Sequence, residues 1–200
     1  YRDGAWRMPK SFSAIPAKTM ADTLIATVKE LSLKVGSVSV NVDRHQIQDQ
    51  HLIHALIMAQ AVLRPVKLVI ELIEDAVNPA VTNQELIPTV QKLNDLGIQF
   101  CLDDVGSGIN TWPEIKSLLP YTSELKYALQ NYKEHLSETN AEHHVAFWQK
   151  IAAEHKMRFI LEGIEDDQDD AWADRMKIDL RQGYYYGKPA LMKIYDSDPD

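Results

Sequence analysis

The chain has 200 residues, of which 45% are hydrophobic and 25% are charged, as expected for one folded globular domain rather than a disordered protein. Its net charge of −8, without a Lys/Arg run, disfavours binding to polymeric nucleic acid, and no apolar stretch approaches the ~18 residues of a membrane helix. The single cysteine, Cys101, excludes an intramolecular disulfide and disfavours a cysteine-based zinc site.

Apolar or β-branched runs alternate with amphipathic stretches along the chain. In order, the patterns predict a helix over Thr19–Leu33, a strand over Val35–Val42, a helix over Gln50–Arg64, a strand over Val66–Leu72, a helix over Asn83–Gly97, strands over Ile98–Leu102 and Glu124–Leu129, a helix over His143–His155, and strands over Arg158–Leu161 and Lys177–Leu180. The acidic run from Asp166 to Asp170 is typical of a solvated helix start. This alternation predicts an α/β fold with a parallel sheet or barrel.

Polar residues stand at or just beyond the ends of the predicted strands. They are Asn41, Glu71, Asp103, Asp104, Lys126, Glu162 and Gln182, with Glu165 three residues after Glu162. Their spacing is roughly one βα unit of ~30 residues, so parallel strands would bring them to one rim, where barrel enzymes carry their active sites. For any one of them taken alone, a polar strand end that faces water is the favoured explanation. Their recurrence on successive strands favours a common site.

The charges of this set constrain its chemistry. Glu71, Asp103, Asp104 and Glu162 would repel one another, and one lysine cannot balance them. Hard divalent cations with oxygen ligands, Mg²⁺ or Mn²⁺, can do so. Adjacent aspartates favour two ions, the arrangement used for phosphodiester hydrolysis, and Lys126 would orient the attacking water or stabilise charge on the phosphoryl oxygens.

Six motifs in one order resemble the EAL-domain family, in a compact and divergent branch. They are Ser39-Val40-Asn41, Ile70-Glu71-Leu72-Ile73-Glu74, Leu102-Asp103-Asp104-Val105-Gly106-Ser107-Gly108, Glu124-Leu125-Lys126, Leu161-Glu162-Gly163-Ile164-Glu165 and Gln182-Gly183-Tyr184. The resemblance extends from about Trp6 to Leu191. It implies a (β/α)₈-like TIM barrel with an antiparallel first strand. It also implies metal-dependent hydrolysis of cyclic di-GMP to linear pGpG.

The resemblance also implies a role for each motif residue. Asn41, Glu71 and Asp103 would hold one Mg²⁺ or Mn²⁺ ion, and Asp103 would bridge to a second ion held by Asp104. Lys126 would contact the nucleophilic water, and Glu162 would act as a ligand or general base. The residues implied around this centre are Glu74, which would anchor the loop after Asp104, and Glu165, Gln182, Gly183, Tyr184 and Pro189.

The chain departs from the family pattern near its N-terminus and just after Lys126. The Glu-Ala-Leu glutamate, a metal ligand in the family, is absent, and the segment from Gly4 to Pro16 resembles the stretch that comes after that motif in the family. We therefore expect the glutamate and two barrel strands upstream of Tyr1. Ala128 stands where the family commonly has Asp. The expected organisation is one N-terminally incomplete barrel domain over 1–195 and a frayed acidic tail over 196–200.

Two functions remain open on the sequence. The first is a cyclic di-GMP phosphodiesterase, favoured by Lys126, Glu162 and the Asp103–Asp104 pair. The second is an inactive cyclic di-GMP receptor or a signalling and dimerisation module, favoured by the missing glutamate. Either function implies cyclic di-GMP as partner and a cytoplasmic protein without membrane insertion, and allows a homodimer.

Histidines and tyrosines offer weaker signals. His51 and His54 share a helix face and His143 adjoins His144, but no third ligand is spaced for zinc, so solvated helix positions are favoured. Tyr184, Tyr185 and Tyr186 are suited either to stacking on guanine or to packing at a barrel rim.

Overall fold

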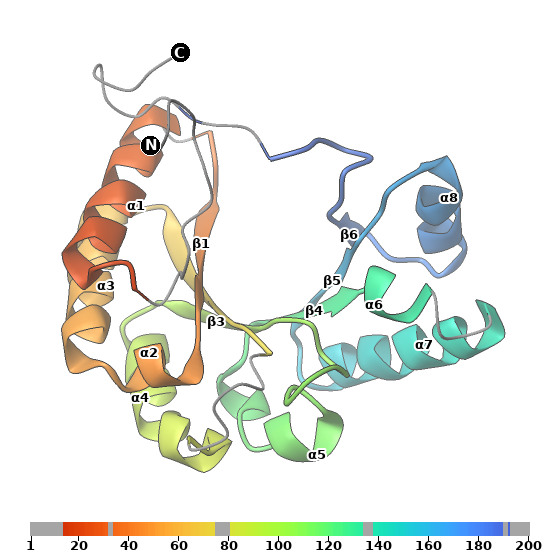
Figure 1. Ribbon diagram of the computed structural model, residues 1–200, viewed down its shortest axis with the longest axis horizontal. Helices are drawn as coiled ribbons and strands as arrows, with labels where there is room; N and C mark the ends of the chain where they lie inside the picture. Colours follow the sequence, from red (N-terminus) through yellow and green to blue (C-terminus); the bar gives the residue numbers. More distant parts are fainter. Residues whose placement is uncertain (1–13, 32–33, 75–80, 134–137, 190–191, 193–200) are drawn as a thin grey trace.

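Six parallel strands in chain order form one curled sheet, a half-barrel, in the computed structural model (Figure 1). The structure describes residues 14–31, 34–74, 81–133, 138–189 and 192. The strands are β1 (Ser37–Val42), β2 (Lys67–Leu72), β3 (Gln99–Leu102), β4 (Glu124–Ala128), β5 (Arg158–Glu162) and β6 (Leu180–Arg181). The α/β class predicted from the sequence is therefore confirmed. The eight-stranded barrel with an antiparallel first strand stays a prediction.

Helices cover the outer face of this sheet (Figure 1). They are α1 (Ala17–Leu31), α2 (Arg44–Gln48), α3 (Gln50–Leu63), α4 (Asn83–Asp95), α5 (Trp112–Ile115), α6 (Gln130–Lys133), α7 (Glu138–Glu154) and α8 (Asp167–Arg175), with a 3₁₀ turn at Leu119–Tyr121. Leu86, Val90 and Leu93 of α4, at helical spacing, are fully buried in the core. Burial of such apolar faces between helices and sheet supplies most of the folding free energy.

The two faces of each strand have different neighbours, and this positions the polar residues. In β2, Leu68, Ile70 and Leu72 are fully buried in the core. Side chains alternate along a strand, so Glu71 points to the opposite, concave face. Asn41 pairs with Glu71, and Glu71 pairs with Cys101, in the parallel register. The polar strand ends therefore follow one another along the concave face.

The last predicted strand is wrong in its bounds. The sequence predicts a strand over Lys177–Leu180, whereas β6 is Leu180–Arg181. Met176 ends α8, and Lys177 has a positive φ of 55°, so the chain is still turning where the predicted strand begins. The apolar signal comes from Ile178, which packs in the core without pairing.

Several expectations fall outside the described residues. They concern the segment from Gly4 to Ser13, the end of the first predicted helix at residues 32–33, Leu191 and the tail 196–200. Among the described residues, no helix combines the length and apolarity needed to span a membrane.

Candidate active site

Lys126 lies at the centre of a buried group of carboxylates contributed by neighbouring strands. Its Nζ is 3.0 Å from Glu71 Oε2, 3.5 Å from Asp103 Oδ1 and 2.6 Å from Glu162 Oε1. Lys126 is 5% exposed and Glu71 is 7% exposed. Little water screens these charges, so their interactions are stronger than those of surface ion pairs.

Four strands deliver these side chains to one rim. Glu71 is the penultimate residue of β2, Asp103 comes directly after β3, Lys126 lies in β4, and Glu162 is the last residue of β5. Parallel strands all end at the same edge of the sheet, and these strands are hydrogen-bonded in order, so the residues converge although they are far apart in the sequence.

Three carboxylates form a group suited to a metal ion. One oxygen from each of Asp103, Asp104 and Glu162 lies within 4.8 Å of the others. All three side chains are partly buried. Hard divalent cations prefer such oxygen ligands, so the donor set fits Mg²⁺ or Mn²⁺.

Burial raises the pKa of both Asp103 and Glu162 above the usual range for a carboxyl group. The Lys126 ammonium opposes this shift in both groups. The pKa of Lys126 is raised in turn. Burial alone would lower it, but the charges of Asp103, Glu162 and Glu71 outweigh burial. Lys126 is therefore firmly protonated, while the carboxylates remain incompletely neutralised.

Asp104 is a further perturbed carboxyl group in this cluster. Burial is the largest cause, and the charges of Asp103, Glu74 and Glu162 add to it, raising the pKa of Asp104 to about 6. A hydrogen bond with the Asn131 side chain acts in the opposite direction. A cation bound beside Asp104 would relieve this repulsion.

The loop after Asp104 is held against β2 by Glu74. The Ser107 hydroxyl, which has one proton to donate, lies within hydrogen-bonding distance of both Glu74 Oε2 and the Asp104 carbonyl oxygen. Gly108 has a positive φ of 49°, and a Cβ there would meet the Glu74 carbonyl oxygen. Glu74 therefore contacts the loop after Asp104, and its role as an anchor of that loop stays a prediction.

A cavity of about 260 Å³ opens beside Glu162. Its lining comes from the turns after β4, β5 and β6, namely Gln130, Glu162, Gly163, Glu165, Gln182, Gly183 and Tyr184. Gly183 is required at this point because any Cβ would clash with the backbone of Ile164. The turns are joined by hydrogen bonds from Ile164 N to Gln182 O, at 3.2 Å, and from Tyr185 N to Ile164 O, at 3.0 Å.

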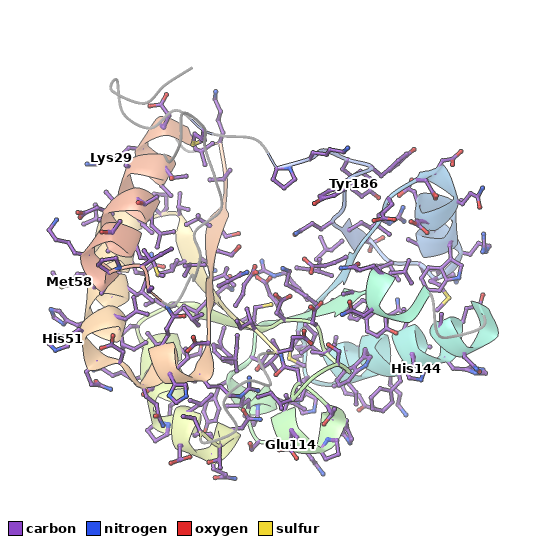
Figure 2. The ribbon with its side chains drawn as sticks, viewed as in Figure 1. Lys29, His51, Met58, Glu114, His144 and Tyr186 are labelled. Carbon is purple, nitrogen blue, oxygen red and sulfur yellow. The ribbon has the colours of Figure 1, made fainter. Side chains whose placement is uncertain are left out.

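Some of the residues predicted from the sequence lie away from the carboxylate cluster and the cavity. Asn41 lies on the same rim, beside Glu71 in the register, and is exposed. Pro189 is exposed and does not line the cavity. His51 on α3 and His144 on α7 lie on the outer helices, away from the concave face (Figure 2). That placement agrees with the solvated positions predicted for them.

The three tyrosines of the β6 turn differ in their surroundings. Tyr184 lines the cavity, whereas the Tyr186 hydroxyl donates to Asp170 of α8, which holds the turn against that helix (Figure 2). The Tyr185 and Tyr186 rings pack edge to face with centroids 5.3 Å apart. All three rings are about half exposed. Of the three, Tyr184 is the residue positioned to meet a ligand in the cavity.

Sequence reasoning misses four residues around the site. Gln130 lines the cavity, Asn131 contacts Asp104, and Asn110 and Arg44 support the loop from beneath. Gln130 and Asn131 follow β4, the strand that contains Lys126, so their place in the sequence is a signal that could have found them. Asn110 and Arg44 belong to no comparable pattern.

The chain belongs to the EAL domain family, whose sequence model matches residues 10–189. The cyclic di-GMP phosphodiesterase PdeR of Escherichia coli (strain K12) is 26% identical over 157 residues, which are 76% of this chain and 23% of PdeR. The chain thus spans about a quarter of the length of that relative.

Solved structures share the fold. PaMucR phosphodiesterase, in a c-di-GMP complex, has a TM-score of 0.70 at 19% identity, covering 86% of this chain and 77% of PaMucR. The EAL domain of Mycobacterium smegmatis DcpA has a TM-score of 0.68 at 20% identity, covering 86% and 78%. A standalone EAL protein from Vibrio cholerae O395, in its c-di-GMP-bound form, has a TM-score of 0.66 at 18% identity, covering 92% and 77%.

Proposed function

We propose that this chain is a metal-dependent cyclic di-GMP phosphodiesterase that yields linear pGpG. The observation that carries the proposal is the convergence of Asp103, Asp104 and Glu162 around one point beside Lys126. Membership of the EAL domain family supports the substrate class, as does the naming of PdeR as a cyclic di-GMP phosphodiesterase.

Asp103, Asp104 and Glu162 would hold the divalent cations, with Glu71 and Asn41 on the adjoining strands as further ligands. Bound Mg²⁺ or Mn²⁺ would neutralise the phosphoryl oxygens and lower the pKa of the attacking water. Asp103 is common to the carboxylate group with Asp104 and Glu162 and to the ion pairs of Lys126. It is the carboxylate that would serve two ions, as the family resemblance implies.

Lys126 and Glu162 would carry the protonation chemistry. The protonated Lys126 can donate hydrogen bonds but cannot accept them. It would therefore orient the attacking water and stabilise the negative charge that builds up on the phosphoryl oxygens. Glu162, whose pKa is raised by burial, would accept the proton of that water. Hydrolysis adds one water across one ester P–O bond, and the released oxygen leaves as a hydroxyl.

The cavity beside Glu162 would receive part of the nucleotide. Gln130 and Gln182 offer amide donors and acceptors, and Tyr184 offers an aromatic face at the cavity edge. Stacking of a base on such a ring contributes about 1–3 kcal/mol. A guanine edge, with both donors and acceptors, suits a cavity lined by glutamines.

The test is turnover of cyclic di-GMP by the purified protein with Mn²⁺ or Mg²⁺, followed by chromatography of the product. We expect pGpG from the wild type and at least about 10²-fold slower turnover from Asp103→Asn. Asp95→Asn is the matched control, because Asp95 is an exposed aspartate at the end of α4. Loss of activity in both variants, or in neither, would contradict the assigned role of Asp103.

A cyclic di-GMP receptor is the second candidate. The ion pairs of Lys126 with Glu71, Asp103 and Glu162 favour it, because they engage the carboxylates that would otherwise be metal ligands. Calorimetry with cyclic di-GMP in EDTA separates the two. Tight binding without metal, together with no pGpG after addition of Mn²⁺, would support the receptor and reject the phosphodiesterase.

A further inference from the structure

Arg44 is a buried cation that belongs to none of the six motifs. It is the first residue of α2, three positions after Asn41, and is 4% exposed. Its guanidinium donates through Nε to Asn83 Oδ1 at 3.2 Å, through Nη1 to the Ile73 carbonyl oxygen at 3.0 Å, and through Nη2 to Asn110 Oδ1 at 2.8 Å. A buried guanidinium is costly unless it is paired, so these contacts fix its position closely.

Asn110 links Arg44 to the ends of β2 and β3, where the clustered carboxylates lie. Its side chain is fully buried, and its Nδ2 donates to the Asp103 carbonyl oxygen at 2.5 Å and to the Leu72 carbonyl oxygen at 3.2 Å. Arg44 occupies Asn110 Oδ1, which orients the amide so that Nδ2 faces the two carbonyls. The network therefore joins the ends of β1, β2 and β3.

The peptide between Asp103 and Asp104 is the group that this network holds. Asn110 binds its carbonyl oxygen, while its N–H, which belongs to Asp104, donates to Asp103 Oδ1 at 3.2 Å. Asp104 has a positive φ of 47°, a conformation that an aspartate keeps when its surroundings enforce it. A rotation of this peptide would swing both carboxylates, because each is attached to one side of it.

Asn110 also closes the loop after Asp104. Gly106 N donates to Asn110 O and Asn110 N donates to Ser107 O, both at 2.9 Å. The side chain and the backbone of one residue thus fix both ends of the segment 103–110.

We propose that Arg44 and Asn110 are a positioning pair that sets the relative orientation of the Asp103 and Asp104 carboxylates for divalent-cation binding. This inference rests on the proposed function, because it assigns those carboxylates to a metal site. Arg44 acts through Asn110 and touches neither substrate nor ion. Residues that orient metal ligands typically change metal affinity by 10–100-fold when they are replaced.

Two variants of the full 200-residue chain test the pair. Arg44→Met removes the guanidinium but keeps most of the side-chain volume. Asn110→Asp keeps the acceptor facing Arg44 and removes the donor facing the Asp103 carbonyl. Calorimetric titration with Mn²⁺ alone should show roughly tenfold weaker affinity for each. In the metal-free variants, hydrogen exchange at the Gly106 and Asn110 amides should be faster than in the wild type.

Leu93→Ala is the control for a merely structural effect. Leu93 is a fully buried residue of α4 whose truncation should lower the melting temperature through a cavity. At a temperature well below all the midpoints, Leu93→Ala should keep wild-type Mn²⁺ affinity and wild-type exchange at Gly106 and Asn110. A folded Arg44→Met or Asn110→Asp protein with wild-type Mn²⁺ affinity would overturn the proposal. An equal loss of affinity in Leu93→Ala would do the same.

Neither readout uses cyclic di-GMP. A wild-type chain that binds Mn²⁺ but makes no pGpG would refute the phosphodiesterase and leave the result for the pair standing. Weakened Mn²⁺ binding in both variants would then still support the positioning role. A wild-type chain that binds no Mn²⁺ would overturn both.

Discussion

Asp104 combines two unfavourable features in one residue. Its backbone is left-handed, which costs an L-residue about 1–2 kcal/mol, and its carboxyl group is partly buried beside other carboxylates. Such features persist where the surrounding structure enforces them, and they gather at functional sites. The poor accommodation of the Asp104 carboxylate without a cation favours a metal site beside it.

Metal affinity should depend on pH through Asp104. The folded pKa is about 6 against an ordinary value of 3.8, so in the metal-free protein Asp104 gains its charge as pH rises through about 6. A cation needs the ionised form, so Mn²⁺ affinity should rise between about pH 5 and pH 7 and then level off. Calorimetry across this range, in buffers of different ionisation enthalpy, should also show proton release near pH 6. An affinity independent of pH would contradict the assignment of Asp104 as a ligand.

The same pKa has a consequence for stability without metal. Because the folded pKa lies above the unfolded one, the folded state binds more protons between about pH 4 and pH 6. The contribution of Asp104 to the free energy of unfolding therefore falls as pH rises through this window. Bound metal should remove that loss.

Lys126 should act in the chemical step more than in substrate binding. Lys126→Met keeps the apolar stem and removes the ammonium that lies among Glu71, Asp103 and Glu162. We expect kcat to fall by at least about 10²-fold while KM changes little, the pattern of an interaction made mainly in the transition state. Lys150→Met is the control, since Lys150 forms an exposed ion pair with Glu154 on α7. A raised KM with an intact kcat would instead make Lys126 a phosphate anchor.

At the scale of elements, β6 shows how a short strand can set the shape of a cavity. It has two residues, yet the turn after it crosses the turn after β5 so closely that Gly183 has no room for a Cβ beside Ile164. The cavity beside Glu162 is lined by these two turns and by Gln130 after β4. The backbone contact at Gly183 therefore helps to set its shape.

Gly183→Ala should open this crossing. The added methyl would push the two turns apart and weaken the hydrogen bonds of Ile164 with Gln182 and Tyr185, costing about 1–3 kcal/mol of stability. Gly187→Ala is the matched control in the same turn, because a Cβ at Gly187 meets nothing within 4 Å. We expect a lower melting temperature and weaker cyclic di-GMP binding for Gly183→Ala alone. Equal effects in the two variants would exclude the crossing as the cause.

Elements with a strong local pattern are predictable, and elements that depend on distant contacts are not. The helix α4 is predictable because its apolar residues recur at helical spacing, and α8 because the acidic run includes its N-cap, Asp166. The four-residue helices α5 and α6 are too short for any periodicity to appear. The strand predicted over Lys177–Leu180 is wrong because a buried turn residue, Ile178, carries the same apolar signal as a strand.

The residues of the candidate site also fall into those that a local sequence pattern predicts and those that it does not. Strand-end carboxylates are visible in the sequence because a charge after an apolar run is conspicuous. Arg44 and Asn110 are 66 residues apart and belong to none of the six motifs, so their contact exists only in the folded chain. Sequence analysis therefore identifies the clustered carboxylates and misses the buried Arg44 and Asn110.

For the whole molecule, metal binding should appear as added stability. A ligand at about 100 times its Kd contributes about 2.7 kcal/mol, which for a domain of this size is a rise in melting temperature of roughly 5–10 °C. Mn²⁺ should produce this rise at pH 7.5, and EDTA should reverse it. Asp103→Asn should lose the rise yet melt no lower than the metal-free wild type, because it removes a carboxyl group whose pKa burial has raised. The same rise in Asp103→Asn would place the ion elsewhere.

Under the proposed function, the charge around Lys126 would set the order in which the metal ions and the dinucleotide bind. Three carboxylates around one ammonium, with Asp104 beside them, leave an excess of negative charge on the rim. A cyclic dinucleotide carries negative phosphodiesters, so the bare rim repels it. Two divalent cations reverse the sign of the rim and turn repulsion into attraction. The concentration of divalent cations would then determine whether the chain binds the dinucleotide. Binding would be ordered, with the metal ions first and the dinucleotide second.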